Sequence, residues 1–273
     1  MGKIKRGDIV TRISYGNDIL FWVKEIIKSR DMLPIAILKG VTIRIETSAP
    51  LDDLNLVNKN IINKQIEEFE RSIETKADKV LEKYNEQMGK RKIFVNHNKA
   101  VILHLDGDRK YSEKSARVYD KFKLNAIVKN IKESRQPFEV VGLLNKYNPD
   151  ILVITGHDGM IKKGYRYNDI YNYRNSKFFV RTVEQARMWE QGENRLAIFA
   201  GACQSYYEAI IGAGANFASS PARILIDFMD PLIIAQTIAI TPEEKYITIE
   251  DVRGNLRDGE KGIGGIGSYG KLK

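Results

Sequence analysis

The sequence predicts an α/β protein in which a small β-barrel and a long helix precede a mainly parallel sheet with helices on both faces. Short β-branched runs separated by turn signals fill residues 4–50. Between residues 58 and 90, apolar side chains recur every three or four positions, as they do on a helix. From residue 92 onward, apolar strand-like runs alternate with amphipathic helices, which is typical of a parallel sheet. We therefore expect four segments, at 1–57, 58–91, 92–250 and 251–273.

The first segment has the features of a small antiparallel module. Its opening, "GDIVTRISYGNDILFWVKEII", contains two strand-like runs around the turn signal "YGND". In "VTIRIET", Val41, Ile43 and Ile45 alternate with polar residues, which indicates a half-buried strand. The segment is similar to SH3-like barrels that open with Gly-Asp-x-Val. Such barrels bind peptides, nucleic acid or neighbouring domains, and the fold alone does not decide among these.

The second segment is expected to be a single linker helix that packs against the domains on either side. It ends in "GKRK", residues 89–92, which is the densest basic cluster of the chain. Its apolar positions form one stripe, and Glu and Lys occupy the other face. The stripe consists of Ile62, Ile66, Phe69, Ile73, Ala77, Val80 and Tyr84.

The third segment is expected to form the parallel sheet, and the fourth a flexible, Gly-rich, basic tail. Strands are predicted at 100–105, 125–131, 150–155 and 195–202. Helices are predicted at 113–122, 138–147 and 177–191, with Pro137 in a first turn and a further helix starting at Cys203.

Composition excludes several classes of protein. No apolar run reaches the roughly 20 residues that span a bilayer, so no membrane span is expected. The single cysteine cannot form an internal disulfide, which fits a reducing cytoplasm. The net charge is +9, but charges of both signs are interleaved. A solvated surface is therefore favoured over a nucleic-acid interface.

Polar residues follow three of the predicted strands. "VILHLDGD" ends in Asp106 and Asp108, "DILVITGHDG" places His157 between glycines, and "LAIFAGAC" ends in Cys203. The carboxyl ends of parallel strands meet at one edge of a sheet, where sites commonly form. The sequence therefore predicts an imidazole, a thiol and carboxylates at one rim.

This combination favours acyl transfer, most simply peptide hydrolysis. Of the three histidines, His97 reads as a polar turn and His104 as part of a buried strand, which leaves His157. A thiol at a helix start gains from the positive end of the helix dipole, and a nearby imidazole stabilises a thiolate or protonates a leaving amine. Backbone N–H groups are candidates for holding an oxyanion. Those at the predicted rim belong to Cys203, Gly156, Asp158 and Gly159.

Metal and cofactor sites are not expected. One cysteine and scattered histidines lack the paired spacing of a zinc site, and "DGDRKYSEK" lacks the spacing of a calcium loop. "GIGGIG" (262–267) lies in the tail without the strand and helix that a dinucleotide site needs.

The chain resembles the caspase-like cysteine peptidases, which include caspases, gingipains, clostripain, legumain and separase. They place a histidine at one strand end and a cysteine at a later one; here the separation is 203 − 157 = 46 positions. Asp158 follows His157 where that group usually has glycine. More closely, "LHLDGD", "PDILVITGHDG", "GACQSYYEAI" and "GANFASSPARILI" resemble the YabG family of sporulation-specific proteases.

The YabG resemblance implies a His157–Cys203 catalytic dyad. It also implies processing of spore coat and related spore proteins, often after basic residues, in the mother-cell cytoplasm or at the spore coat.

Cleavage after arginine requires a carboxylate in the first specificity pocket. Related Arg-specific enzymes place this acid at the end of the first core strand. Asp108 is the first choice because it lies further beyond the strand than Asp106, and the alternative for both is a turn residue. Asp158 is a third candidate, and its alternative role is to orient His157. Ser219 and Ser220 are expected to border the substrate cleft.

Two rival interpretations differ in class. Amidotransferase-like enzymes also carry a cysteine at a strand–helix elbow, but their histidine follows the cysteine. Here all three histidines precede Cys203. A nucleic-acid- or protein-binding scaffold built on the SH3-like module fits the net charge, but it leaves the His–Cys pair unexplained.

Overall fold

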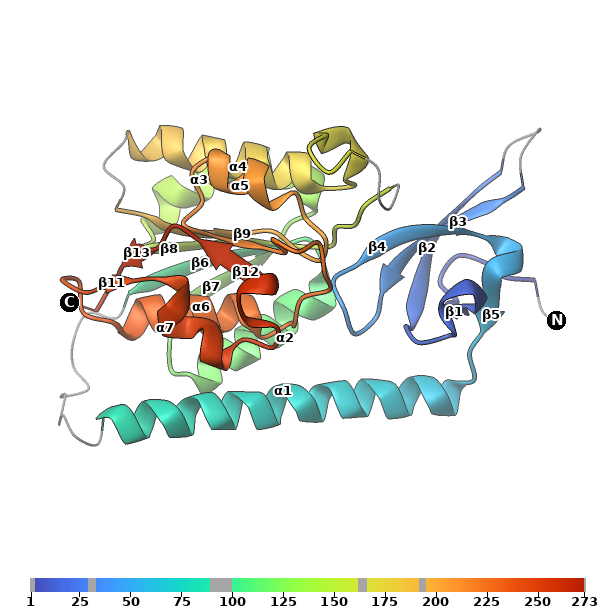
Figure 1. Cartoon of the computed structure of the whole chain (residues 1–273), viewed down its shortest axis with the longest axis horizontal. Coiled ribbons are helices and arrows are strands. Elements are labelled where there is room, and N and C mark those ends of the chain that lie inside the picture. Colours follow the sequence, from blue (N-terminus) through green and yellow to red (C-terminus); the bar gives the residue numbers. More distant parts are fainter. Residues whose placement is uncertain (1–2, 29–32, 89–99, 162–165, 192–194, 273) are drawn as a thin grey trace.

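The fold consists of an N-terminal antiparallel sheet, one long helix and a three-layer α/β domain. The computed structural model describes residues 3–28, 33–88, 100–161, 166–191 and 195–272. Figure 1 shows the antiparallel sheet standing against one edge of the α/β domain, with the long helix running beneath that domain.

Five strands form the N-terminal sheet in the order β4-β3-β2-β1-β5, all antiparallel. They are β1 (Ile9–Arg12), β2 (Phe21–Ile27), β3 (Ile35–Gly40), β4 (Glu46–Pro50) and β5 (Leu54–Leu56). No pairing joins β4 to β5 among the described residues, so the expected SH3-like barrel is not confirmed. Ile45, expected within a strand, instead forms a single bridge to Asp158 in the α/β domain.

The long helix is α1 (Lys59–Met88), and its apolar stripe packs as the sequence predicts. Ile73, Ala77 and Val80 are buried in the core, with Phe69 packed beside them. On the same side, acidic residues of α1 form ion pairs with Lys114, Arg117 and Lys121. The expected boundary at 91/92, the "GKRK" cluster and His97 lie outside the described residues.

The central sheet has the order β12-β10-β9-β8-β6-β7. Its strands are β6 (Val101–Asp106), β7 (Asn125–Asn130), β8 (Ile151–Thr155), β9 (Ala197–Ala200), β10 (Phe217–Ser219) and β12 (Ile263–Gly265). The first five pair in parallel, which confirms the predicted sheet, and β12 adds an antiparallel edge. In the described part of the chain, no helix is both long and apolar enough for a membrane span.

Helices cover both faces of this sheet (Figure 1). One face carries α3 (Gln136–Tyr147), α4 (Ser176–Glu190) and α5 (Tyr207–Gly212). The other carries α2 (Arg109–Lys121), α6 (Asp230–Ile240) and α7 (Ile249–Val252), with α1 outside them. Strand alternation assigns side chains to these faces: in β6, Leu103 and Leu105 pack under α3, whereas Ile102 packs on the α2 side.

The last residues of the chain form strands, in contrast to the flexible tail that the sequence predicts. Residues 263–265 form β12, and Ser268–Tyr269 (β13) pairs with Tyr246–Ile247 (β11). The glycines that suggested flexibility allow close packing instead, because a Cβ on Gly265 would lie 2.3 Å from the carbonyl oxygen of Asn216. The α/β domain therefore extends past residue 250.

Replacing Ile263 with alanine is expected to destabilise the fold by about 2–5 kcal/mol, since its side chain is fully buried in the core. Ile266→Ala is the matched control, because that side chain is 62% exposed and its loss should cost under about 0.5 kcal/mol. Urea unfolding of the two variants tests this. Equal midpoints would mean that the segment does not belong to the cooperative fold.

Candidate active site

Strands β6, β8 and β9 end at the same edge of the central sheet. Asp106 pairs with Thr155, and Ile154 pairs with Ala200, so the residues that follow each strand emerge side by side. At the end of β9, Gly201 has a φ of 115° and its α-carbon faces Ser219, to which a Cβ would be 3.0 Å away. Glycine adopts this backbone conformation without strain and has no Cβ to crowd Ser219. The turn brings Cys203 to the rim that already carries His157.

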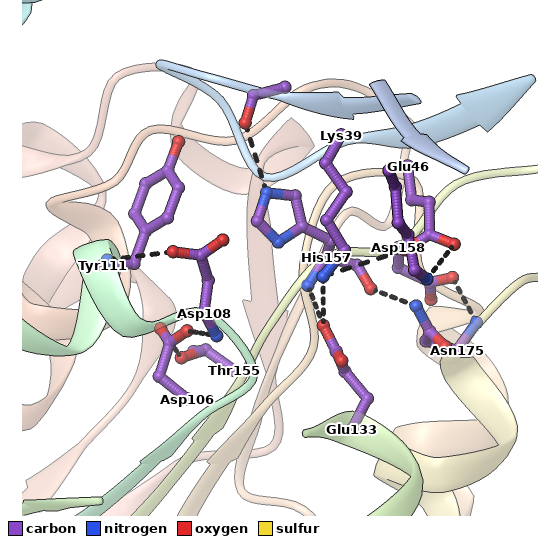
Figure 2. Close-up of polar contacts among 12 residues, drawn as sticks. Lys39, Glu46, Asp106, Asp108, Tyr111, Glu133, Thr155, His157, Asp158 and Asn175 are labelled. Carbon is purple, nitrogen blue, oxygen red and sulfur yellow. Dashed lines mark hydrogen bonds and ion pairs between the residues drawn. The ribbon is translucent and has the colours of Figure 1, made fainter. Parts of the chain in front are cut away.

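His157 is fully buried and is held by its backbone as well as its ring (Figure 2). Its N–H donates to Glu133 at 2.8 Å, and its carbonyl accepts from Asn175 at 2.7 Å. The ring Nε2 lies 3.3 Å from the carbonyl oxygen of Gly40, and because a carbonyl only accepts, Nε2 carries the proton of the neutral ring. Among the described residues, Nδ1 has no partner. Burial and then the charge of Lys39 hold the pKa of His157 well below its usual range.

Cys203 departs from its expected position at a helix start. It lies in a turn, with Gln204 at a φ of 54°, and α5 begins only at Tyr207. The Ala202 N–H donates to the Ser205 hydroxyl, and the Gln204 N–H donates to the carbonyl oxygen of Ile224. The Cys203 sulfur accepts from the Ile226 N–H at 3.4 Å. Burial raises the pKa of Cys203 to about 12, the opposite of the lowering expected from a helix dipole.

Asp158 lies beneath the rim and accepts four hydrogen bonds. The donors are the N–H groups of Gly159 and Asn175 and the hydroxyls of Ser176 and Ser205. Ser205 also accepts from Ala202, so this carboxylate links the His157 loop to the Cys203 loop. Burial raises the pKa of Asp158 to about 6 despite these bonds.

Asp158→Asn is expected to remove a pH dependence of stability between pH 4 and 6. A carboxyl whose pKa is raised on folding binds its proton more tightly when folded, so its contribution is present below the unfolded pKa and falls as pH rises towards 6. The full change is about 3 kcal/mol. Asparagine keeps an acceptor for the two N–H groups and does not titrate. Urea unfolding at pH 4–7 measures this; parallel curves for wild type and variant would contradict the assignment.

Asp106 is fully buried, and its carboxylate has three donors, of which Figure 2 shows Asp108 and Thr155. Its Oδ1 accepts from the Asp108 N–H at 2.8 Å, and its Oδ2 accepts from Thr155 at 2.7 Å and from Arg44 at 2.8 Å. On the other side of Thr155, the Nε2 of His104 donates to the Thr155 hydroxyl, and the Tyr119 hydroxyl donates to the Nδ1 of His104. His104 is thus structural, as the sequence indicates, and it orients the Thr155 hydroxyl towards Asp106.

The other predicted residues have different surroundings. Asp108 is half-buried and caps α2 by accepting from the N–H groups of Lys110 and Tyr111. Ser219 and Ser220 are fully buried; the Ser220 hydroxyl donates to Ile224, while Ser219 Oγ has no partner among the described residues. The Gly159 N–H is bound by Asp158, and Gly156 packs against Glu133.

A segment of the N-terminal domain covers the rim. The loop between β3 and β4, residues 41–45, reaches over the strand ends, and Ile45 bridges to Asp158. Arg44, at 1% exposure, inserts beside Asp106, while Lys39 lies 3.7 Å from Glu133. Sequence reasoning missed Lys39 and Arg44 because only the packing of the two domains brings them to the rim. It also missed Tyr111 and Glu133, which the α/β domain itself places there, in the first turn of α2 and after β7.

Two grooves flank this covering loop. One, of about 890 Å³, is lined by residues that include Ile45, Thr47, Met160 and Gln204. The other, of about 360 Å³, is lined by residues that include Thr42, Ile43 and Ile226. The chain on each side of Arg44 therefore borders a groove. Among the described residues, no group of three or more His, Cys, Asp and Glu side chains is arranged to hold a metal ion.

The chain belongs to a peptidase family, because the model described as YabG peptidase U57 matches residues 5–273. A curated relative is the sporulation-specific protease YabG of Bacillus subtilis (strain 168). It is 36% identical over 277 residues, which cover 98% of this chain and 96% of the relative. No solved structure matches the chain.

Proposed function

We propose that the protein is a cysteine endopeptidase that cleaves spore coat and related spore proteins after arginine, with Cys203 as nucleophile and His157 as its acid–base partner. The observation that carries this proposal is the emergence of both residues from adjacent parallel strands at one rim, in a chain of a peptidase family. The mainly parallel sheet with helices on both faces also fits the caspase-like architecture proposed for residues from 92 onward.

Hydrogen bonding supports a role for His157 as base. In the neutral ring Nε2 carries the proton, and the unpartnered Nδ1 is the position free to accept one. In the proposed step, the Cys203 proton passes to this ring and the sulfur attacks the substrate carbonyl carbon. The imidazolium then protonates the leaving amine as the C–N bond breaks. Water hydrolyses the thioester, which releases the carboxylic acid and restores the thiol.

The Asp158 N–H is the best candidate for the oxyanion donor. It donates at 3.3 Å to a backbone carbonyl oxygen of the covering loop, so it points into the space above the rim. The Gly159 N–H is already occupied by the Asp158 carboxylate. Because four donors already bind the Asp158 carboxylate, we assign it to holding the His157 loop in place and not to binding substrate.

Asp106 is favoured over Asp108 as the acid that selects arginine. Its carboxylate already binds a guanidinium in a buried site, whereas Asp108 is half-buried and caps a helix. Tyr111 and Phe228 form aromatic walls for that guanidinium, at 5.0 and 5.2 Å from the ring centroids. A guanidinium between aromatic faces and next to a buried carboxylate is well stabilised, and an ammonium would gain less.

The substrates and location are proposed from the relative. The B. subtilis protein is named as sporulation-specific, so the proposed setting is the mother-cell cytoplasm or the spore coat, with spore proteins as partners.

The test is a cleavage assay with full-length protein on spore coat extract and on a peptide library, with new C-termini mapped by mass spectrometry. We expect new termini at arginine, and a thiol alkylator should prevent them because Cys203 is the only cysteine. Cleavage that persists after complete alkylation would contradict cysteine catalysis. Termini without arginine would contradict the specificity.

A further inference from the structure

We propose that residues 43–46 occupy the substrate cleft in the manner of a bound peptide, with Arg44 in the arginine pocket, so that the chain blocks its own active site. This inference rests on the proposed function, and it assigns both the position of a substrate arginine and the state of the isolated protein.

The side chain of Arg44 has the contacts of a substrate arginine. Its Nη2 donates to Asp106 at 2.8 Å, and its guanidinium lies over Tyr111 and Phe228. Among the described residues, Nε and Nη1 have no hydrogen-bond partner. Buried arginines that serve structure alone are normally fully hydrogen-bonded, so a guanidinium with one partner is one that the pocket can release.

The backbone of this segment also lies where a substrate backbone must lie. The Arg44 carbonyl oxygen accepts the Asp158 N–H, the proposed oxyanion donor, at 3.3 Å. The Arg44 backbone also lies close enough to Cys203 to lower the pKa of its thiol. Two residues further on, the Glu46 N–H donates to the Asp158 carbonyl at 2.8 Å. The segment pairs with the rim as an extended peptide does.

A groove lies on each side of Arg44. Residues 42–43 line the groove on one side, and Ile45 and Thr47 line the larger groove on the other. A substrate with arginine at the position of Arg44 would therefore run through both grooves. It can do so only when the loop has left.

Burial makes proton transfer between the two groups harder while the loop is in place. It raises the pKa of Cys203 and lowers that of His157, so the transfer of the thiol proton to the ring, with which the proposed reaction begins, is disfavoured. The ring Nε2 is also occupied by the Gly40 carbonyl at the start of the covering loop. Departure of the loop would admit water to both groups and free the ring. The same movement therefore opens the pocket and activates the nucleophile.

Arg44→Ala tests the proposal in the full chain. We expect at least a tenfold rise in kcat/KM for an Arg-containing peptide and at least a tenfold faster alkylation of Cys203. Arg117→Ala is the control, because it removes an arginine that pairs with Glu70 on α1, away from the rim, and should change neither rate. Should the alanine variant not fold, Arg44→Gln keeps part of the aliphatic side chain and an amide donor but removes the charge that pairs with Asp106, and an increase of several-fold in both rates is expected.

A second measurement tests the occupant directly. The synthetic peptide GVTIRIET, residues 40–47, should compete with the Arg substrate or be cut after arginine in the Arg44→Ala chain. The peptide GVTIAIET should do neither. If Arg44→Ala and wild type show equal Cys203-dependent cleavage and equal alkylation, the inference is overturned and the proposed function stands. If neither chain shows Cys203-dependent cleavage, the proposed function fails and the inference with it.

Discussion

Replacing Cys203 with alanine is expected to lower kcat/KM for an arginine peptide by about 10⁴-fold or more, because no other thiol is present in the chain. The pocket and the proposed oxyanion donor remain in this variant, so it should still bind the peptide. Activity is measured with a fluorogenic peptide in both the wild-type and the Arg44→Ala chain. Binding to the inactive variant is measured by calorimetry.

His157→Ala is the companion variant, and a loss of at least about 10³-fold is expected. The double variant should lose little more than Cys203→Ala alone, because the two groups act as a unit. Thermal unfolding of each variant separates lost chemistry from lost structure. If either single variant folds normally and retains full activity, the dyad is wrong.

Asp106→Asn is expected to abolish the preference for arginine. Leaving a buried guanidinium without its carboxylate costs about 3–5 kcal/mol, which corresponds to a loss of about 10² to 10⁴ in kcat/KM for arginine. The sharp readout is the ratio of kcat/KM for a peptide with arginine to that for one with citrulline, its neutral analogue. This ratio should fall towards one. It does not depend on how much of the variant is folded.

Asp108→Asn is the matched control. Asparagine caps a helix about as well as aspartate does, so this substitution should cost under about 0.5 kcal/mol of stability and leave the arginine-to-citrulline ratio unchanged. Asp106→Asn also removes the partner of Arg44. The cleavage rate of this variant therefore changes both through the pocket and through the covering loop, so the arginine-to-citrulline ratio is the quantity that tests the pocket. A control variant that loses the preference while Asp106→Asn retains it would return Asp108 to the pocket.

Local patterns predicted most of the elements of the fold. The stripe of α1 and the apolar runs of β6, β8 and β9 follow directly from side-chain periodicity, which is a property of neighbouring residues. The prediction of a flexible tail was wrong because a glycine-rich segment has no hydrophobic periodicity from which strands could be predicted. Whether such residues are mobile or packed depends on what lies opposite them, and opposite β12 lies β10.

The prediction of a helix that starts at Cys203 was wrong for a related reason. "CQSYYEAI" is compatible with a helix, but Gln204 has a left-handed φ of 54° and its N–H donates to the carbonyl oxygen of Ile224, so the chain turns once more before α5. This contact joins residues 20 positions apart, and a local pattern does not reveal it.

The sequence by itself determined that His157 and Cys203 follow strands of a parallel sheet, because strand signals and strand ends are local and parallel strands end at one edge. Only the tertiary structure decided which carboxylate is buried with a guanidinium and what covers the rim. Arg44 is 62 positions from Asp106, and a contact over that distance depends on how two domains pack. Local periodicity carries no information about such a contact.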